Sequence, residues 1–150
     1  SGGMTLSNRG YHEITGIAWS GQGKITRVTE YGGYEAEEGP AGNYLYFTKF
    51  RHSGIWRVPL AGGREEKVVE GVSSLYDETF SLLDDCIVYR VKTDDGMNVY
   101  KRNLVSGETV LLTHVAGSGI GGFSIDKSRR VLLYEKRMKD LESDIILASY

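Results

Sequence analysis

The sequence has little of several residue types that would narrow its class at once. A single cysteine, Cys86, excludes an internal disulfide, and only two of the 150 residues are proline. No apolar run approaches the roughly 20 residues of a membrane-spanning helix. The formal net charge is −2, so the chain lacks the positive excess typical of proteins that bind nucleic acid or acidic membranes. What remains is a chain of ordinary globular composition, long enough for one domain with a buried core.

Glycine and tyrosine are the abundant residues. The chain has 20 glycines and 10 tyrosines, and its apolar runs are short. This combination favours short strands joined by tight turns. Cys86 is followed by Ile87 and Val88, so we expect it to be a buried strand residue and not a nucleophile.

One stretch organises the rest of the chain. Residues 54–70, GIWRVPLAGGREEKVVE, read as two short strands around a Gly-Gly turn, and variants return twice. Phe47, Tyr89 and Tyr134 occupy one position of the repeat, at spacings of 42 and then 45 residues. Other matched positions are Ile55-Trp56, Val99-Tyr100 and Ile145-Ile146, and then Leu60, Leu104 and Tyr150. Several strands in a repeat of about 40–45 residues are the signature of β-propeller blades.

The pattern predicts both the strands and a core. The expected strands cover residues 24–29, 43–49, 55–60, 67–69, 86–91, 98–104, 109–113, 131–136 and 145–150, with another plausible at 14–19. The residues expected to be largely buried are Phe47, Trp56, Tyr89, Tyr100, Val131, Leu133 and Ile145. Residues 1–22 are expected to form an N-terminal extension, which opens with a Ser-Gly-Gly typical of cloning remnants.

The run GNYLYFTKFRHSGIWRVPLAGGREEKVV, preceded by GKITRVTEYGG, resembles a blade of the TolB-like, WD40-like bacterial propellers. The resemblance covers about residues 23–150. It implies an all-β, β-propeller-like domain of about three four-stranded blades, in the bacterial periplasm or cytoplasm. A shorter run, GIAWSGQGKITRV at residues 16–28, resembles the C-terminal domain of the sulfite oxidase family and carries no functional expectation.

Three blades are too few to close a ring, since propellers have about four or more. We therefore expect closure by strand exchange or oligomerisation, most simply in a homodimer of six blades. The strand at 24–29 of one chain would pair with the strand at 145–150 of the other. The alternative is that the chain is part of a larger propeller.

Candidate functional residues are few. Glu35, Glu37 and Glu38 form an acidic cluster beside an expected loop, and His52 lies in an expected hairpin turn. These four are the predicted binding residues, for a cation or a basic partner. The three histidines lack metal-binding spacing, and no catalytic motif is present, so we predict no catalytic residue, metal or cofactor.

Two classes of function stay open. The first is a non-enzymatic binding or scaffold module that holds a protein or peptide partner on its loops, without nucleic acid or membrane insertion. The second is a hydrolase- or lyase-type propeller with a carboxylate or histidine cluster in its channel. The repeats carry no recurring histidine or carboxylate at equivalent positions, which favours the binding module.

Overall fold

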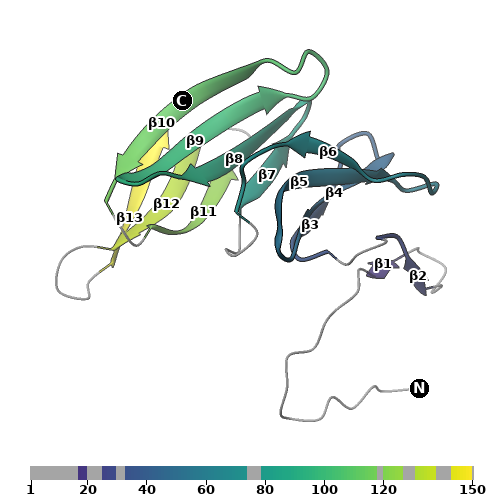
Figure 1. Ribbon diagram of the computed structural model, residues 1–150. Helices are drawn as coiled ribbons and strands as arrows, with labels where there is room; N and C mark the ends of the chain where they lie inside the picture. Colours follow the sequence, from purple (N-terminus) through teal and green to yellow (C-terminus); the bar gives the residue numbers. More distant parts are fainter. Residues whose placement is uncertain are drawn as a thin grey trace, which may run out of the picture.

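The structure is a computed structural model, and it describes residues 17–19, 25–29, 33–73, 79–117, 120–126, 131–137 and 143–149. The described residues form thirteen strands and no helix (Figure 1), so the all-β prediction is confirmed. Within these residues nothing resembles a helix able to cross a membrane. Every sheet is antiparallel, with strands joined in chain order as a simple meander.

Two of the sheets have four strands and resemble propeller blades. The first sheet consists of β3 (Ala36–Glu38), β4 (Tyr44–Lys49), β5 (His52–Pro59) and β6 (Glu66–Val69). The second sheet consists of β7 (Phe80–Leu83), β8 (Cys86–Lys92), β9 (Gly96–Asn103) and β10 (Thr109–Ala116). Figure 1 shows the two sheets side by side, with β6 and β10 as the outer strands.

The third sheet differs from the prediction. It contains β11 (Ile120–Asp126), β12 (Val131–Arg137) and β13 (Ser143–Ser149), so the described residues give it three strands where a four-stranded blade was expected. The expected strand at 24–29 appears as β2 (Ile25–Arg27), which pairs with β1 (Ile17–Trp19) of the same chain. Pairing of that strand with a second chain stays a prediction, as does closure of the ring.

The aromatic register found in the sequence is confirmed by the strand pairing. In each of the three larger sheets the residue of the Phe47 position lies directly across from the residue of the Trp56 position. The three cross-strand pairs are Phe47–Trp56, Tyr89–Tyr100 and Tyr134–Ile146. The equivalent backbone amides of Leu60 and Leu104 also donate to equivalent carbonyls, those of Asn43 and Asp85. The repeat in the sequence is therefore a repeat in space.

Apolar side chains fill the two interfaces between the sheets. The first interface is centred on Ile55, Phe80 and Ile87, and joins the first sheet to the second. The second interface is centred on Val88 and Val99, with Ile125 from the third sheet against them. Because each sheet alternates its side chains between two faces, the second sheet is buried on both sides. Burial on this scale is the main stabilising term of the fold.

The predicted core residues divide into three groups. Phe47, Tyr89 and Cys86 are buried, as expected. Trp56 and Tyr100, which were expected to be largely buried, are partly buried. Both lie on the third strand of a four-stranded sheet, directly across from the buried Phe47 and Tyr89. The side chains of Val131, Leu133 and Ile145 lie outside the described residues.

The first strand of each sheet was missed by the sequence pattern. These strands are β3, β7 and β11. β3 has only three residues, AEE, and reads as polar. Its backbone is nevertheless in register with β4, where Ala36 lies across from Phe47. A short polar strand forms here because the next strand offers a complete ladder, a tertiary effect that local propensity does not contain.

Candidate functional site

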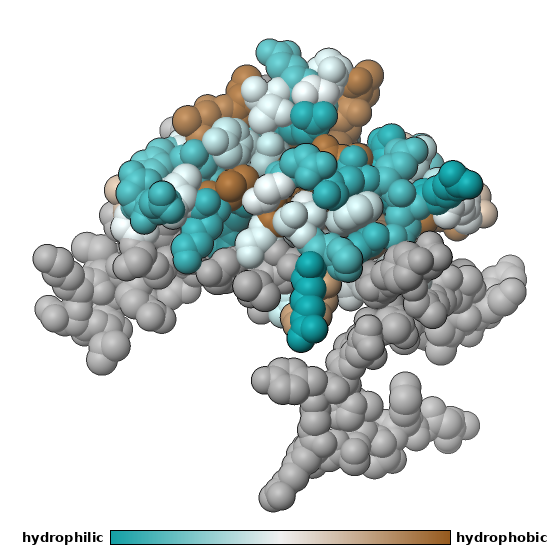
Figure 2. Space-filling view, viewed as in Figure 1, coloured by the Kyte–Doolittle hydropathy of each residue, from teal (hydrophilic) through white to brown (hydrophobic). Residues whose placement is uncertain are grey.

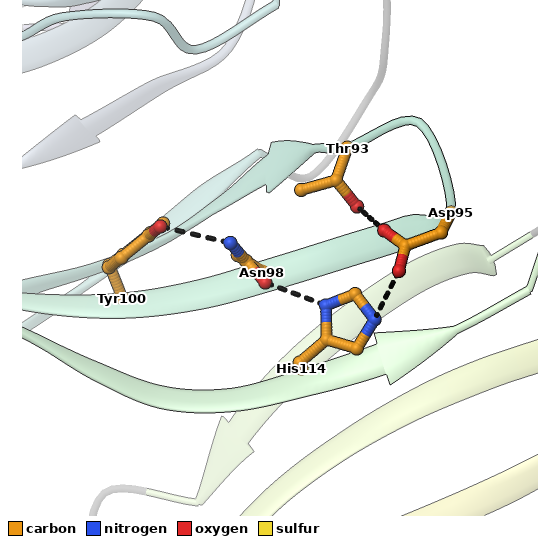
Figure 3. Close-up of polar contacts among 5 residues, drawn as sticks. All are labelled: Thr93, Asp95, Asn98, Tyr100 and His114. Carbon is orange, nitrogen blue, oxygen red and sulfur yellow. Dashed lines mark hydrogen bonds and ion pairs between the residues drawn. The ribbon is translucent and has the colours of Figure 1, made fainter.

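A chain of five polar side chains crosses one face of the second sheet (Figure 3). Its members are Thr93, Asp95, Asn98, Tyr100 and His114. They come from the β8–β9 hairpin turn and from the neighbouring strands β9 and β10. We call this set the hairpin site. Each member touches the next, so the site is continuous from the core to the hairpin turn.

The hairpin turn fixes the outer end of the site. Thr93 donates its backbone N–H to the Gly96 carbonyl at 3.0 Å and its hydroxyl to Asp95 Oδ1 at 2.9 Å. The hydrogen bond from the Thr93 hydroxyl is the largest cause of the lowered pKa of the Asp95 carboxyl, and the Asp95 backbone N–H and the nearby His114 lower it further. The Asp95 side chain is exposed. The backbone carbonyl of Asp95 accepts a hydrogen bond from the Gly117 N–H at 2.8 Å, which fixes the position of the residue. An ionised carboxylate is therefore held in one place at the surface.

His114 occupies the centre of the site because β9 and β10 place it directly across from Asn98. Its Nδ1 lies 2.7 Å from Asn98 Oδ1, and its Nε2 lies 3.5 Å from Asp95 Oδ2. The Asn98 amide donates to the Tyr100 hydroxyl at 3.0 Å, which directs Asn98 Oδ1 toward the imidazole. Both ring nitrogens thus face oxygen atoms, and the orientation of the ring is set from two sides.

Tyr100 anchors the inner end. Its ring stacks on Tyr89, with centroids 5.6 Å apart and planes inclined by 26°. Tyr89 is buried in the first interface, and burial raises the pKa of its phenol. Stacked aromatic pairs of this kind add stability beyond their buried area. The exposed end of the site is therefore tied through Asn98 to a rigid part of the core.

Exposed apolar residues adjoin the hairpin site. Leu111 lies across from Tyr100 on β10 and is 54% exposed, and its neighbour Val110 is 45% exposed. Figure 2 shows apolar residues gathered along the rim formed by β10, on a face that is otherwise largely hydrophilic. An exposed apolar rim beside preorganised polar groups is the composition of a recognition surface.

The structure gives two of the predicted binding residues a place between the sheets. Glu35, directly before β3, accepts from the Thr79 N–H at 2.9 Å and from the Thr79 hydroxyl at 2.5 Å. Glu37 accepts from the Leu82 N–H at 2.8 Å. Burial raises the pKa of Glu35. These two carboxylates join the first strand of one sheet to the first strand of the next.

The other two predicted binding residues lie apart from each other. Glu38 is exposed on β3, and His52 is exposed at the start of β5, with β4 between them. His52 follows a tight turn in which Arg51 has a positive φ of 64°. A binding role for Glu35, Glu37, Glu38 and His52 stays a prediction.

Sequence reasoning missed the hairpin site. The sequence pattern indicates only a turn at Asp95-Gly96, and His114 follows the strand expected at 109–113. β10 in fact continues to Ala116 and carries His114 opposite Asn98. The Asp95-Gly96 pair is a sequence signal of a hairpin turn, and the structure has the β8–β9 turn there. The contact of Asn98 with His114 depends instead on the turn between β9 and β10 and on a register shift between Leu111 and Thr113.

The side chains of the described residues form no recognisable metal centre. Among the residues that the structure describes, no group of three His, Cys, Asp or Glu side chains is arranged to hold a metal ion. In the hairpin site one histidine faces one carboxylate, and its other contact is an amide. The site is thus suited to hydrogen bonding and charge recognition.

Comparisons with known proteins give a likeness of structure. No family model matches the chain, and no curated protein matches it. TolB from Acinetobacter baumannii has a TM-score of 0.61 and 11% identity, over 78% of this chain and 29% of that chain. The tricorn protease has a TM-score of 0.55 and 14% identity, over 82% of this chain and 14% of that one. The chain thus spans less than a third of either structure. At these identities the likeness shows the fold alone, and the sheets of this chain are similar to the β-propeller regions of TolB and the tricorn protease.

Proposed function

We propose that this chain is a non-enzymatic, propeller-type binding module that holds a protein or peptide partner at the hairpin site. The observation that carries the proposal is the preorganised array of Asp95, Asn98 and His114 next to exposed Leu111. Because these polar groups are already fixed in place, a partner need not order them, and less conformational entropy is lost on binding. Apolar contacts at Leu111 would supply the affinity and the polar groups the selectivity.

The chemistry of the site supports recognition over covalent catalysis. Its five members include no serine or cysteine, and the Thr93 hydroxyl is used to hold Asp95. Catalytic nucleophiles are activated by a neighbouring general base, a lowered pKa or a metal ion. Here the imidazole of His114 contacts an amide and a carboxylate. We therefore assign the site a binding role.

A random-peptide library displayed on phage tests the proposal. Panning against the whole chain should enrich peptides that lose binding when His114→Ala or Leu111→Ser is introduced. The matched control is His52→Ala, an exposed histidine on the first sheet, which should leave binding unchanged. Enriched peptides that bind the His114 and Leu111 variants as well as the wild type would contradict the proposal, and so would a library that yields no binder.

We also propose that the chain closes its ring with a second copy. β13 ends the third sheet, and the described residues place no strand beyond it. Among the described strands β2 pairs only with β1, so its other edge could pair with a strand of a second copy. Exchange of β2 and β13 between two chains would be isologous and would leave β10 on the outside of the ring.

Light scattering distinguishes the ring from a monomer. A homodimer at micromolar concentration is expected, and deletion of residues 1–29 should dissociate or unfold it. A stable, well-folded monomer would rule the dimeric ring out. An unchanged dimer after the deletion would show that the exchange of β2 is wrong.

A further inference from the structure

The two outer strands of the four-stranded sheets differ in how their free edges are protected. β6 is short, four residues, and contains Glu66 and Lys67. β10 is eight residues long, TVLLTHVA, and carries no Asp, Glu, Lys or Arg. Short length and charged side chains are the usual protection of an outer edge against pairing with another chain. β6 has both of these features, and β10 has neither.

The third strands of the two sheets carry the same contrast in charge. In the first sheet Arg57 is paired with Glu66 on β6, at 2.8 Å. Trp56 and Tyr100 are equivalent, so the position of Arg57 corresponds to Lys101, which lies across from Val110. Neither Lys101 nor the adjacent Arg102 has an ion pair among the described residues. In the first sheet, the outer strand β6 places a carboxylate across from this position. In the second sheet, the outer strand β10 places an apolar residue there.

Arg102 extends toward the free edge of β10. It lies across from Thr109, the first residue of β10, and its Nη1 donates to the Thr109 hydroxyl at 3.1 Å. The guanidinium therefore lies over the outer strand. A strand added beyond β10 would run about 4.8 Å from it. A glutamate or aspartate side chain of that strand could then reach the Arg102 guanidinium.

We propose that the free edge of β10 accepts an extended segment of a partner protein whose side chains alternate between acidic and apolar. The main chain of the segment would extend the ladder of the second sheet, which is β-augmentation. Its carboxylates would pair with Arg102 on one face of the sheet, and its apolar side chains would cover Val110 on the other face. The inference rests on the proposed function and names the chemical class of its partner. Charge favours this occupant over a second copy of β10, which carries no acidic side chain.

The probe is a capped peptide of alternating valine and glutamate, as long as the eight residues of β10. It is titrated into the isotopically labelled chain and followed by amide chemical shifts and hydrogen exchange. We expect the β10 amides to shift and to exchange more slowly. A valine–lysine peptide of the same length and a valine–glutamate peptide N-methylated at alternate residues should not bind, because the first has the wrong charge and the second cannot form the ladder.

Matched substitutions locate the contact. Arg102→Gln should weaken binding of the valine–glutamate peptide roughly tenfold, the effect of losing one charge-assisted hydrogen bond. Leu111→Glu should abolish binding, because it places a negative charge beside the glutamates of the peptide. The controls are Arg57→Gln, which changes the equivalent region of the first sheet, and Val105→Glu, which adds the same charge at an exposed turn residue. Both controls should bind the peptide like the wild type.

The results separate the inference from the proposed function. Equal binding of the valine–lysine peptide, shifts that map outside β10, or unchanged affinity in Arg102→Gln and Leu111→Glu would overturn the inference. Association of the chain with itself through β10, abolished by Leu111→Glu, would identify a second copy as the occupant and also overturn it. If phage panning enriches non-acidic peptides that depend on His114, the proposed function stands while the inference fails.

Discussion

Glu35 and Thr79 occupy the same position in two successive sheets, and the carboxylate of one accepts two hydrogen bonds from the other. The equivalence is seen in the backbone, where the Glu35 carbonyl accepts from the Thr48 N–H and the Thr79 carbonyl accepts from the Arg90 N–H, both at 3.0 Å. Thr79 is buried, so the carboxylate satisfies a donor that water does not reach. The repeat thus links its own copies side by side.

Substitution of Glu35 should separate its hydrogen-bonding role from its charge. Glu35→Ala leaves the buried Thr79 N–H without its acceptor and should lower the free energy of unfolding by about 1–3 kcal/mol. Glu35→Gln keeps an acceptor oxygen and should cost less at neutral pH. Urea denaturation of both variants measures the difference. Equal costs for Ala and Gln would show that the hydrogen bonds to Thr79 do not matter.

The pH dependence of stability follows from the raised pKa of Glu35, whose largest cause is burial. A carboxyl with a higher pKa in the folded state than in the unfolded state binds its proton more tightly when folded. Its ionisation therefore weakens the fold as pH rises through the folded pKa, and the penalty is absent below 4.5, the ordinary pKa of a glutamate carboxyl. Relative to Glu35→Gln, the wild type should gain stability as pH falls from 7 toward 4.5. A constant difference across that range would contradict the assignment.

The sequence predicted the middle strands of each sheet well because their signal is local. Phe47, Tyr89 and Tyr134 recur at one position, and dense β-formers surround them. Burial against both neighbouring sheets requires such residues, so the pattern in the chain and the packing in space agree. The cross-strand pairs followed from the same alignment.

The first strands and the hairpin site could not be found in this way. Glu35 and Glu37 read as a solvated acidic run, yet their carboxylates accept hydrogen bonds from Thr79 and Leu82 of the next sheet. These contacts join residues 44 and 45 positions apart, which no local propensity encodes. His114 belongs to the hairpin site because β10 continues to Ala116, beyond the apolar run that predicted a strand at 109–113.

Trp56 offers a test of how its ring contributes. Its Nε1 is buried without a hydrogen-bond partner among the described residues, while Lys49 Nζ lies 3.7 Å from the ring centroid. Trp56→Phe keeps an aromatic face and removes the unpartnered N–H, so it should change the free energy of unfolding by less than about 1.5 kcal/mol. Trp56→Ala should cost about 3–5 kcal/mol. Similar losses in thermal or urea denaturation for Phe and Ala would show that the indole N–H is needed.

Removing one member of the buried Lys49–Glu65 ion pair should destabilise the fold more than removing both members. Their side chains are 6% and 9% exposed. Lys49→Met removes the ammonium group that faces the buried Glu65 carboxylate and should cost about 3–5 kcal/mol, and adding Glu65→Leu should recover much of that loss. The control is Lys67→Met, whose partner Glu70 is exposed, so the cost should be at most about 1 kcal/mol. A double variant less stable than Lys49→Met would contradict this account.

Gly96 should be required for the position of β10. A Cβ added there would lie 2.1 Å from the Val115 carbonyl oxygen, a backbone atom of β10, so the outer strand must move. Gly96→Ala should therefore lower the free energy of unfolding by about 1–3 kcal/mol and speed hydrogen exchange of the β10 amides. Gly33→Ala is the matched control, because its nearest neighbour would be the Phe47 ring at an ordinary 3.4 Å. Displacement of β10 would also carry His114 away from Asp95, and peptide binding at the hairpin site should weaken in Gly96→Ala alone. Exchange rates in β10 equal to those of the wild type would show that the strand absorbs the methyl group without moving.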